Sequence, residues 1–241
     1  MNADVLFKQG KLNEAIDALT AHMRERPEDT RNRTFLFELL CFAGEFERAA
    51  KHLDVLAQGS EGAALGAILY QGVLQAELTR REMFDSGRHA STGPAPAHTL
   101  TGSLNGRPFQ SLMDADRRVG ARLEVFAAGS YLWLPLEHVA SIEMNAPQRL
   151  RDLIWAPAVV RSGPAFQGRE LGEVLLPALC PLSYQHPDDA VKLGRLTEWV
   201  ADEEHEEIPM GQKMLLVDGE ETPFLEVRRI EINAVRAEAT A

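Results

Sequence analysis

Two short acidic motifs bring together residue types that could hold a metal ion. The motif HPDD supplies His186, Asp188 and Asp189, and the motif MDAD supplies Asp114 and Asp116. Carboxylate oxygens and imidazole nitrogens are ligands of divalent cations. The HPDD motif also fits a proline turn followed by acidic residues that start a helix, because carboxylates stabilise the positive end of a helix. We favour the helix start and expect no bound metal or cofactor.

An enzyme or a small-ligand-binding protein stays open as the alternative function. Its site would lie in the second half of the chain, and it requires Asp114, Asp116, His186 and Asp188 to converge in one pocket. The sequence has no G-x-S-x-G nucleophile elbow, no H-E-x-x-H zinc motif and no glycine-rich phosphate-binding motif. We therefore favour a protein that binds another protein.

Tryptophans beside arginines form a second group of candidate binding residues. Trp133 lies in the stretch YLWLP and Trp155 in the stretch RLRDLIWAP. An indole packed in the core, with its N–H hydrogen-bonded, is the default interpretation. The alternative is a surface patch, because aromatic residues and arginine dominate the binding energy of protein interfaces. The candidate patch comprises Trp133, Arg149, Asp152, Trp155, His186, Asp188 and Arg195.

Composition narrows the class of partner. The chain has 241 residues, of which 45% are hydrophobic and 25% charged, as is typical of a globular protein. Its net charge of −11 disfavours nucleic acid and anionic membrane surfaces, because both attract a basic face. Neither a signal peptide nor an apolar run long enough to span a bilayer is visible. We therefore expect a cytoplasmic protein whose partner is another protein.

The elements that position the candidate residues begin with a repeat of 34 residues. Gly10 followed by Ala15 recurs as Gly44 followed by Ala49. Glycine ends a helix in the left-handed region without strain, and alanine lets two helices approach closely. The apolar positions around these pairs keep the same spacing, so residues 1–61 resemble tetratricopeptide repeats. The pattern predicts two helix-turn-helix units.

Stacked units of this kind form a curved surface lined by the first helix of each unit. A groove that mixes aromatic and charged side chains can hold an amphipathic helix or an extended peptide. A further helical pattern from Leu65 to Leu78 predicts a capping helix over the second unit. The alternative is that the repeats only pack against the rest of the chain. The residues predicted on the inner face are Asp4, Phe7, Lys8, Arg31, Thr34, Glu38, Cys41 and Phe42.

Beyond the repeats the pattern changes from helical to strand-like. Residues 85–99 are rich in Gly, Ser, Pro and Ala and predict a linker or surface loop. We expect an α+β protein with a tetratricopeptide-like helical domain over residues 1–84 and a β-rich domain over residues 100–241. The β-rich domain is expected to be a small antiparallel sheet or a partly closed, barrel-like sheet. Its clearest strand patterns are Leu123–Phe126, Tyr131–Leu134, Val139–Glu143 and Glu173–Leu176.

Four stretches of the sequence resemble the ImpE/TagJ family of type VI secretion accessory proteins. They follow the order of the family and cover nearly the whole chain. Cys180 and Leu182 stand where members of the family tend to carry an aromatic residue and a glycine. The stretches are LFELLCFAGEFERAAKHLD, NGRPFQSLMDADRRVGARLEVFAAGSYLWLPLEHVASIE, RLRDLIWAPA and LPALCPLSYQHPDDAVKLGRLTEW.

This resemblance implies a non-enzymatic cytoplasmic protein associated with the contractile sheath. It implies that the chain binds the N-terminal helix of the small sheath subunit, and that it thereby influences how the AAA+ unfoldase recycles contracted sheath. It carries no catalytic residue over to this sequence. The repeat independently predicts a helix-binding groove, so the function we expect is that of a binding adaptor.

Overall fold

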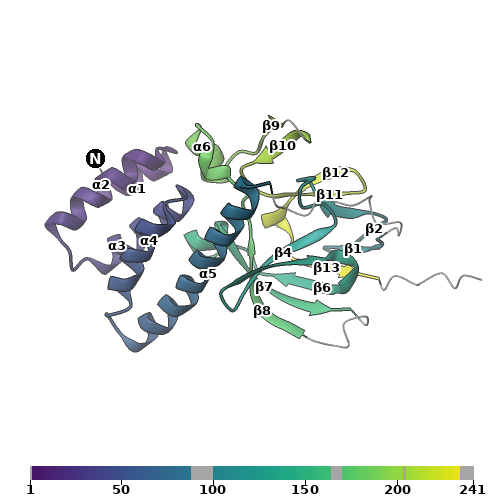
Figure 1. Ribbon diagram of the computed structural model, residues 1–241, viewed down its shortest axis with the longest axis horizontal. Coiled ribbons are helices and arrows are strands. Elements are labelled where there is room, and N and C mark those ends of the chain that lie inside the picture. The colour runs from purple at the N-terminus through teal and green to yellow at the C-terminus, as the bar shows by residue number, and fades with distance from the viewer. Residues whose placement is uncertain (1, 88–99, 164–169, 203–204, 234–241) are drawn as a thin grey trace, which may run out of the picture.

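The computed structural model describes residues 2–87, 100–163, 170–202 and 205–233. Helices occupy the first part of the chain and strands the second, and the two parts lie side by side (Figure 1). The predicted linker at 85–99 falls for the most part outside the described residues. The first five helices are α1 Ala3–Lys8, α2 Leu12–Glu25, α3 Thr30–Phe42, α4 Phe46–Leu56 and α5 Glu61–Asp85.

The first four helices form two antiparallel pairs. Gly10 separates α1 from α2 and Gly44 separates α3 from α4, with backbone φ angles of +79° and +70°. Only glycine adopts this left-handed conformation at little cost, which explains the sequence spacing. Ala15 and Ala49 are both fully buried where the paired helices meet. Helix α5 then packs against α4 and continues to the sheet.

An eight-stranded antiparallel sheet organises the second part, in the order β2-β1-β13-β6-β7-β8-β4-β5. Two smaller sheets have the orders β12-β11-β3 and β10-β9. The strands are β1 Gly102–Leu104, β2 Arg107–Phe109, β3 Leu112–Asp114, β4 Arg122–Ala127, β5 Ser130–Pro135, β6 Val139–Met144, β7 Trp155–Ser162, β8 Glu170–Pro177, β9 Glu198–Asp202, β10 Glu206–Met210, β11 Met214–Val217, β12 Glu220–Pro223 and β13 Arg229–Ile232.

The expected barrel-like closure is wrong. Among the described strands, β2 pairs only with β1 and β5 pairs only with β4, so the large sheet has two edges and stays open. The physical reason is that both faces already have cover. Trp155 and Leu175 on one face join the core of the helices. Ala156 and Leu176 on the other face join a second core, to which Leu112 and Leu215 of the three-stranded sheet contribute. A sheet buried by other elements on both faces does not need to close on itself.

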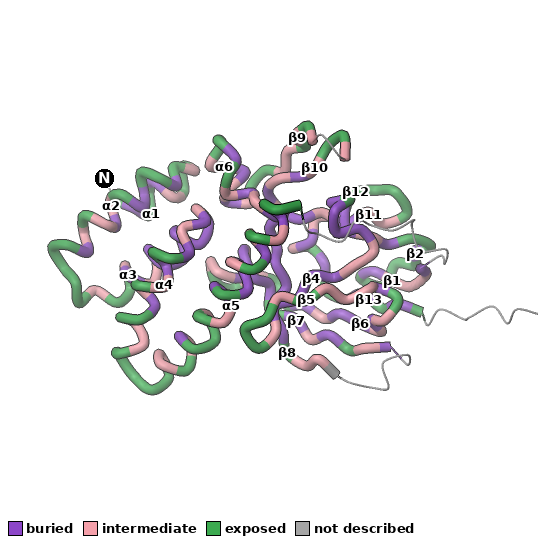
Figure 2. Tube along the Cα trace, in the orientation of Figure 1, coloured by how far each residue is buried: buried purple, intermediate pink, exposed green. Residues whose placement is uncertain are grey.

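The helices and one face of the sheet therefore share the first of these two hydrophobic cores. Phe126, Ile154 and Trp155 from the second part pack in the same cluster as the buried residues of α2 to α5. Figure 2 shows the buried residues, in purple, concentrated at this junction and in the centre of the sheet, while the outer turns of α2 are exposed. Among the described helices, none is long and apolar enough to cross a membrane.

Candidate partner-binding surface

Asp114 lies in a buried cluster of ion pairs that joins α5 to the sheet. Lys213 Nζ lies 2.5 Å from both Asp114 Oδ2 and Glu124 Oε2, and Arg80 Nε lies 2.8 Å from Glu124 Oε1. Burial raises the pKa of Asp114 to about 6, and neighbouring carboxylates add to the effect. Burial also opposes ionisation of Glu124, but Arg80 and Lys213 hold its pKa below the ordinary value. The cluster balances two carboxylates with two cations in the interior of the protein, and Asp114 is 4% exposed.

The other members of the predicted metal or catalytic set each have a separate partner. Asp116 pairs with Arg118 at 2.7 Å, and His186 Nε2 lies 3.3 Å from Glu198 Oε2. Asp188 accepts a hydrogen bond from the backbone N–H of Ala190 and caps a short helix, as the helix-start interpretation predicted. Across the described ranges, no group of three or more His, Cys, Asp or Glu residues is placed to hold a metal.

Residues 183–195, which we call the clasp segment, fasten the second part of the chain to both helix pairs. This segment contains α6, Asp189–Lys192. Asp189 Oδ2 accepts a hydrogen bond of 2.8 Å from the backbone N–H of Leu12, at the start of α2. Arg195 donates to the backbone oxygens of Phe7 and Lys8 at 2.7 and 3.2 Å. Both groups therefore bind the α1–α2 pair around the turn at Gly10.

The clasp segment also contacts the second glycine turn. The ring of Tyr184 packs against Gly44 so closely that a Cβ at that position would overlap it. The same ring meets Phe46 edge-to-face, with centroids 5.9 Å apart. Gly44 is therefore required twice, once for the backbone turn and once for the approach of the clasp segment.

The predicted tryptophan patch is not one surface. Trp155 is buried, donates its Nε1–H to Glu77 at 2.8 Å and packs against Tyr70. Trp133 is half-buried between Phe84 and Arg122. Of the remaining members, Asp152 and His186 are buried, whereas Arg149, Asp188 and Arg195 are exposed. The interpretation of the tryptophans as core residues fits Trp155, which is buried, and fits Trp133 in part, because that side chain is half-buried.

The predicted inner face is divided between surface and interior. Asp4, Lys8 and Arg31 are exposed, and Phe7 lies beneath the guanidinium of Arg195. Contrary to the expectation of an open face, three members are buried: Glu38, Cys41 and Phe42.

Glu38 pairs with Arg151 of the second part at 2.9 Å, and burial raises the pKa of its carboxyl group. A substitution at Glu38 therefore perturbs the junction between the two parts of the chain.

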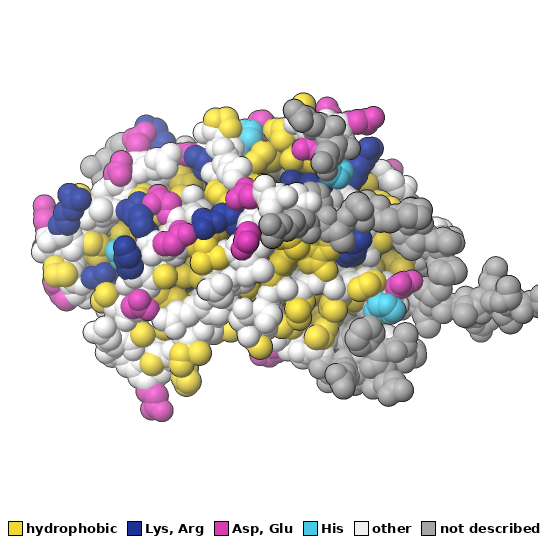
Figure 3. All heavy atoms as spheres, in the orientation of Figure 1, with side chains coloured by type: hydrophobic (Ala, Val, Ile, Leu, Met, Phe, Trp, Pro, Cys, Tyr) yellow, Lys and Arg dark blue, Asp and Glu magenta, His cyan; other side chains and the backbone are white. Residues whose placement is uncertain are grey.

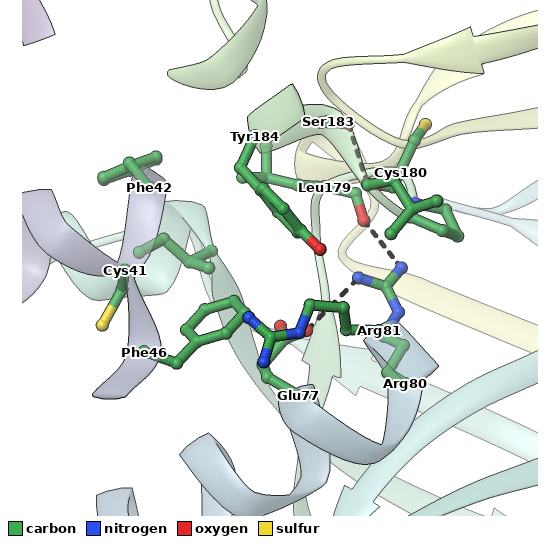
Figure 4. Close-up of a pocket in the computed structure, with 13 residues that line it drawn as sticks. Cys41, Phe42, Phe46, Glu77, Arg80, Arg81, Leu179, Cys180, Ser183 and Tyr184 are labelled. Atoms are coloured by element: carbon green, nitrogen blue, oxygen red, sulfur yellow. Dashed lines mark hydrogen bonds and ion pairs between the residues drawn. The ribbon is translucent and has the colours of Figure 1, made fainter. Parts of the chain in front are cut away.

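Cys41 and Phe42 line a small cavity at this junction. Figure 4 shows them on the helical side, with Tyr184 and Cys180 on the other side and Arg80 reaching toward the Leu179 carbonyl. The cavity has a volume of about 30 Å³, which is room for about one water molecule. It is too small for a peptide side chain of any size.

A larger groove lies beside the first half of α5, and we call it the α5 groove. Its volume is about 580 Å³. Thr34, the one residue of the predicted inner face that lines it, stands with Phe37 on one wall, and Arg149 and Arg151 stand on another. Gly62, Ala63, Gly66 and Ala67 keep the first part of the α5 wall free of large side chains, and Leu69 and Tyr70 follow them along α5. The groove is open and large enough for the side chains of a bound helix.

Three large aliphatic side chains stand exposed on α5, and one of them, Leu69, lines this groove. Leu65, Ile68 and Leu69 are 65%, 66% and 54% exposed, and we call them the α5 ridge. Figure 3 shows hydrophobic side chains, in yellow, at the surface where α5 begins. The sequence pattern placed these residues in a capping helix over the second repeat, because their i, i+3, i+4 spacing is that of a buried face. In the structure this apolar face is exposed.

The comparisons with known proteins identify the family. The sequence model of the ImpE protein family matches residues 106–231, more than half of the chain. The chain belongs to the ImpE family. It is also 31% identical to the type VI secretion system accessory component TagJ of Pseudomonas aeruginosa, over 98% of this chain and 93% of that protein.

A crystal structure supports the same fold. The chain superimposes on a protein from Vibrio parahaemolyticus with a TM-score of 0.83, over 96% of this chain and 97% of the other. The two are 21% identical, so this likeness concerns the fold alone. The ImpE match covers the clasp segment and most of the sheet, whereas α1 to α5 and β1 lie before it.

Proposed function

We propose that this protein is a type VI secretion accessory adaptor that binds the N-terminal helix of the small sheath subunit in the α5 groove. Membership of the ImpE family and the identity with TagJ support an accessory role in type VI secretion. The observation that carries the helix-binding part is the α5 ridge beside an open groove. Exposed apolar patches on globular proteins typically mark interaction sites.

The chemistry of the surface fits an amphipathic helix. Such a helix docks by placing apolar side chains at i, i+3, i+4 and i+7 into a hydrophobic groove. Leu65, Ile68 and Leu69 present the complementary spacing, and the small residues of α5 leave room for the incoming side chains. Full burial of one such aliphatic side chain contributes about 1.5–3 kcal/mol. The loss of rotational and translational freedom on binding offsets part of this burial free energy. Burial of a few such side chains therefore predicts a dissociation constant on the order of micromolar.

The proposed action on the sheath follows from this binding. An adaptor that holds the N-terminal helix of the small sheath subunit in the cytoplasm controls whether the AAA+ unfoldase reaches that helix. Recycling of contracted sheath would then depend on competition between the adaptor and the unfoldase for one segment. The enzyme alternative receives no support from the described residues, because Asp114, Asp116, His186 and Asp188 have separate partners.

Calorimetric titration tests the proposal. A synthetic peptide with the sequence of the sheath-subunit helix is titrated into wild type, Leu69→Ser and Leu196→Ser. Leu69 is 54% exposed and lines the α5 groove, whereas Leu196, the matched control, is 44% exposed and lies outside it. We expect saturable binding to wild type and Leu196→Ser, and a roughly tenfold loss for Leu69→Ser from the lost apolar contact. Equal affinity for all three proteins would place the helix elsewhere, and no heat at all would remove the helix-binding function.

A further inference from the structure

A second groove continues from the α5 groove, and we call it the sheet groove. It has a volume of about 370 Å³ and lies between α5 and the face of the strands β4, β6, β7 and β8. Leu69 and Tyr70 line both grooves, so the two meet at this point of α5. The α5 residues that line the first groove run from Gly62 to Tyr70, and those that line the second run from Leu69 to Val73. The two grooves therefore follow one another along α5.

The charges of the two grooves are opposite. Among the described residues, the charged side chains that line the α5 groove are Arg149 and Arg151. Those that line the sheet groove are Glu143 and Glu173. The arginine end is notable in a chain whose net charge is −11.

Two of these charges are already engaged within the protein. Arg151 pairs with Glu38 at 2.9 Å, and Glu143 pairs with Arg161 at 2.8 Å. Arg149 and Glu173 are exposed, so they are the charges best placed to meet a bound molecule. One exposed cation and one exposed anion thus stand in successive grooves on either side of the shared pair Leu69 and Tyr70.

From this arrangement we infer that the two grooves form one track that holds a partner helix in a single direction. The inference rests on the proposed function, because the occupant is the amphipathic helix proposed above. Its apolar stripe lies against Leu69 and Tyr70, which line both grooves. Its acidic residues lie at the Arg149 end, and its basic residues lie at the Glu173 end. The reversed orientation would place like charges together, which disfavours it. The track therefore selects helices whose acidic and basic residues are segregated along their length.

The test couples charge changes in the protein to charge changes in the peptide. The probe is the synthetic sheath-subunit helix, made in three forms: native, with every Asp and Glu changed to Asn and Gln, and with every Lys and Arg changed to Gln. Each form is titrated into wild type, Arg149→Glu and Glu173→Lys. Thermal melts of the three proteins confirm that each variant is folded, which is expected because both side chains are exposed.

The expected result is a selective loss of affinity. Arg149→Glu weakens binding of the native peptide and of the peptide without basic residues by about threefold, the size of an exposed charge pair, and leaves the peptide without acidic residues unchanged. Glu173→Lys weakens binding of the native peptide and of the peptide without acidic residues by a similar factor. It leaves the affinity for the peptide without basic residues unchanged. The directional track would be overturned if wild type bound the native peptide but each protein variant lost the same affinity for all three peptides, or lost none. The adaptor function would still stand in that case. No binding of the native peptide to wild type would overturn both.

Discussion

Asp189 caps a helix that begins 177 positions earlier in the chain. Its carboxylate accepts the backbone N–H of Leu12 at 2.8 Å, at the start of α2, where helix N–H groups have no partner within the helix. Lys11, the residue at the N-cap position of α2, makes no side-chain capping bond. The cap of α2 is therefore supplied by the clasp segment, and the stability of α2 depends on docking between the two parts of the chain.

Removing the carboxylate of Asp189 tests this cap. We expect Asp189→Ala to lower the free energy of unfolding by about 1 kcal/mol, the typical cost of replacing an N-cap side chain by alanine. Urea unfolding of wild type, Asp189→Ala and the control Asp17→Ala measures the difference. Asp17 is an exposed carboxylate on the same helix. If the two variants lost the same free energy, the cap would contribute nothing beyond general surface charge.

Asp114 predicts a pH dependence of stability. Its pKa is about 6 in the folded protein against an ordinary 3.8, so the folded protein holds a proton between these values that the unfolded chain has lost. The stability contributed by this group is therefore present below about pH 4 and is lost as the pH rises through about 6. On lowering the pH from about 7 to about 5, we expect wild type to gain about 1 kcal/mol relative to Asp114→Asn, which cannot take up the proton.

The measurement is urea unfolding of both proteins at the two pH values. Because other titrating groups are common to both, their contributions cancel in the difference. A difference that stayed constant between the two pH values would show that Asp114 remains ionised through this range.

At the scale of elements, the turn between α3 and α4 carries two separate demands. Gly44 has a φ of +70° and also lies against the ring of Tyr184, whereas Gly172 has nearly the same φ of +69° with open space around it. Alanine at either position carries the cost of the left-handed conformation, about 1–2 kcal/mol. At Gly44 overpacking against the ring adds about 1–3 kcal/mol.

Comparison of Gly44→Ala with Gly172→Ala therefore isolates the contact with the clasp segment. We expect Gly44→Ala to be the less stable of the two in urea unfolding. Similar stabilities would mean that Tyr184 moves aside at little cost, and that the clasp segment does not hold this turn.

The helix turns could be predicted from the sequence, because glycine at 10 and 44 with alanine five positions later reflects the backbone conformation of the turn itself. The environment of α5 could not. Glu77 and Arg80 look like surface residues on a helix, yet both are buried, because Trp155 and Glu124 supply their partners from distant positions. A periodic pattern indicates which residues share a face, but not what covers that face.

For the whole molecule, the α+β order of elements followed from the change of periodicity near residue 85, whereas the open edge of the sheet did not. Whether a sheet closes into a barrel depends on which other elements bury its two faces. Here the helices cover one face, and the strands β3 and β11 contribute to the second core on the other. The predicted inner face failed as an open surface for a related reason. Glu38 and Phe42 face the second part of the chain, which the repeat pattern alone does not include. The surface left open is the α5 groove with its ridge.

The central claim is that a partner helix binds along the first half of α5. Hydrogen–deuterium exchange of the full chain, with and without saturating sheath-subunit helix, tests it most directly. The account predicts slower exchange in residues 61–73 on binding, with α1 unchanged. Protection confined to α1 and the first turn of α3, around the exposed residues Asp4, Lys8 and Arg31, would contradict it and would place the partner on the opposite part of the helical surface.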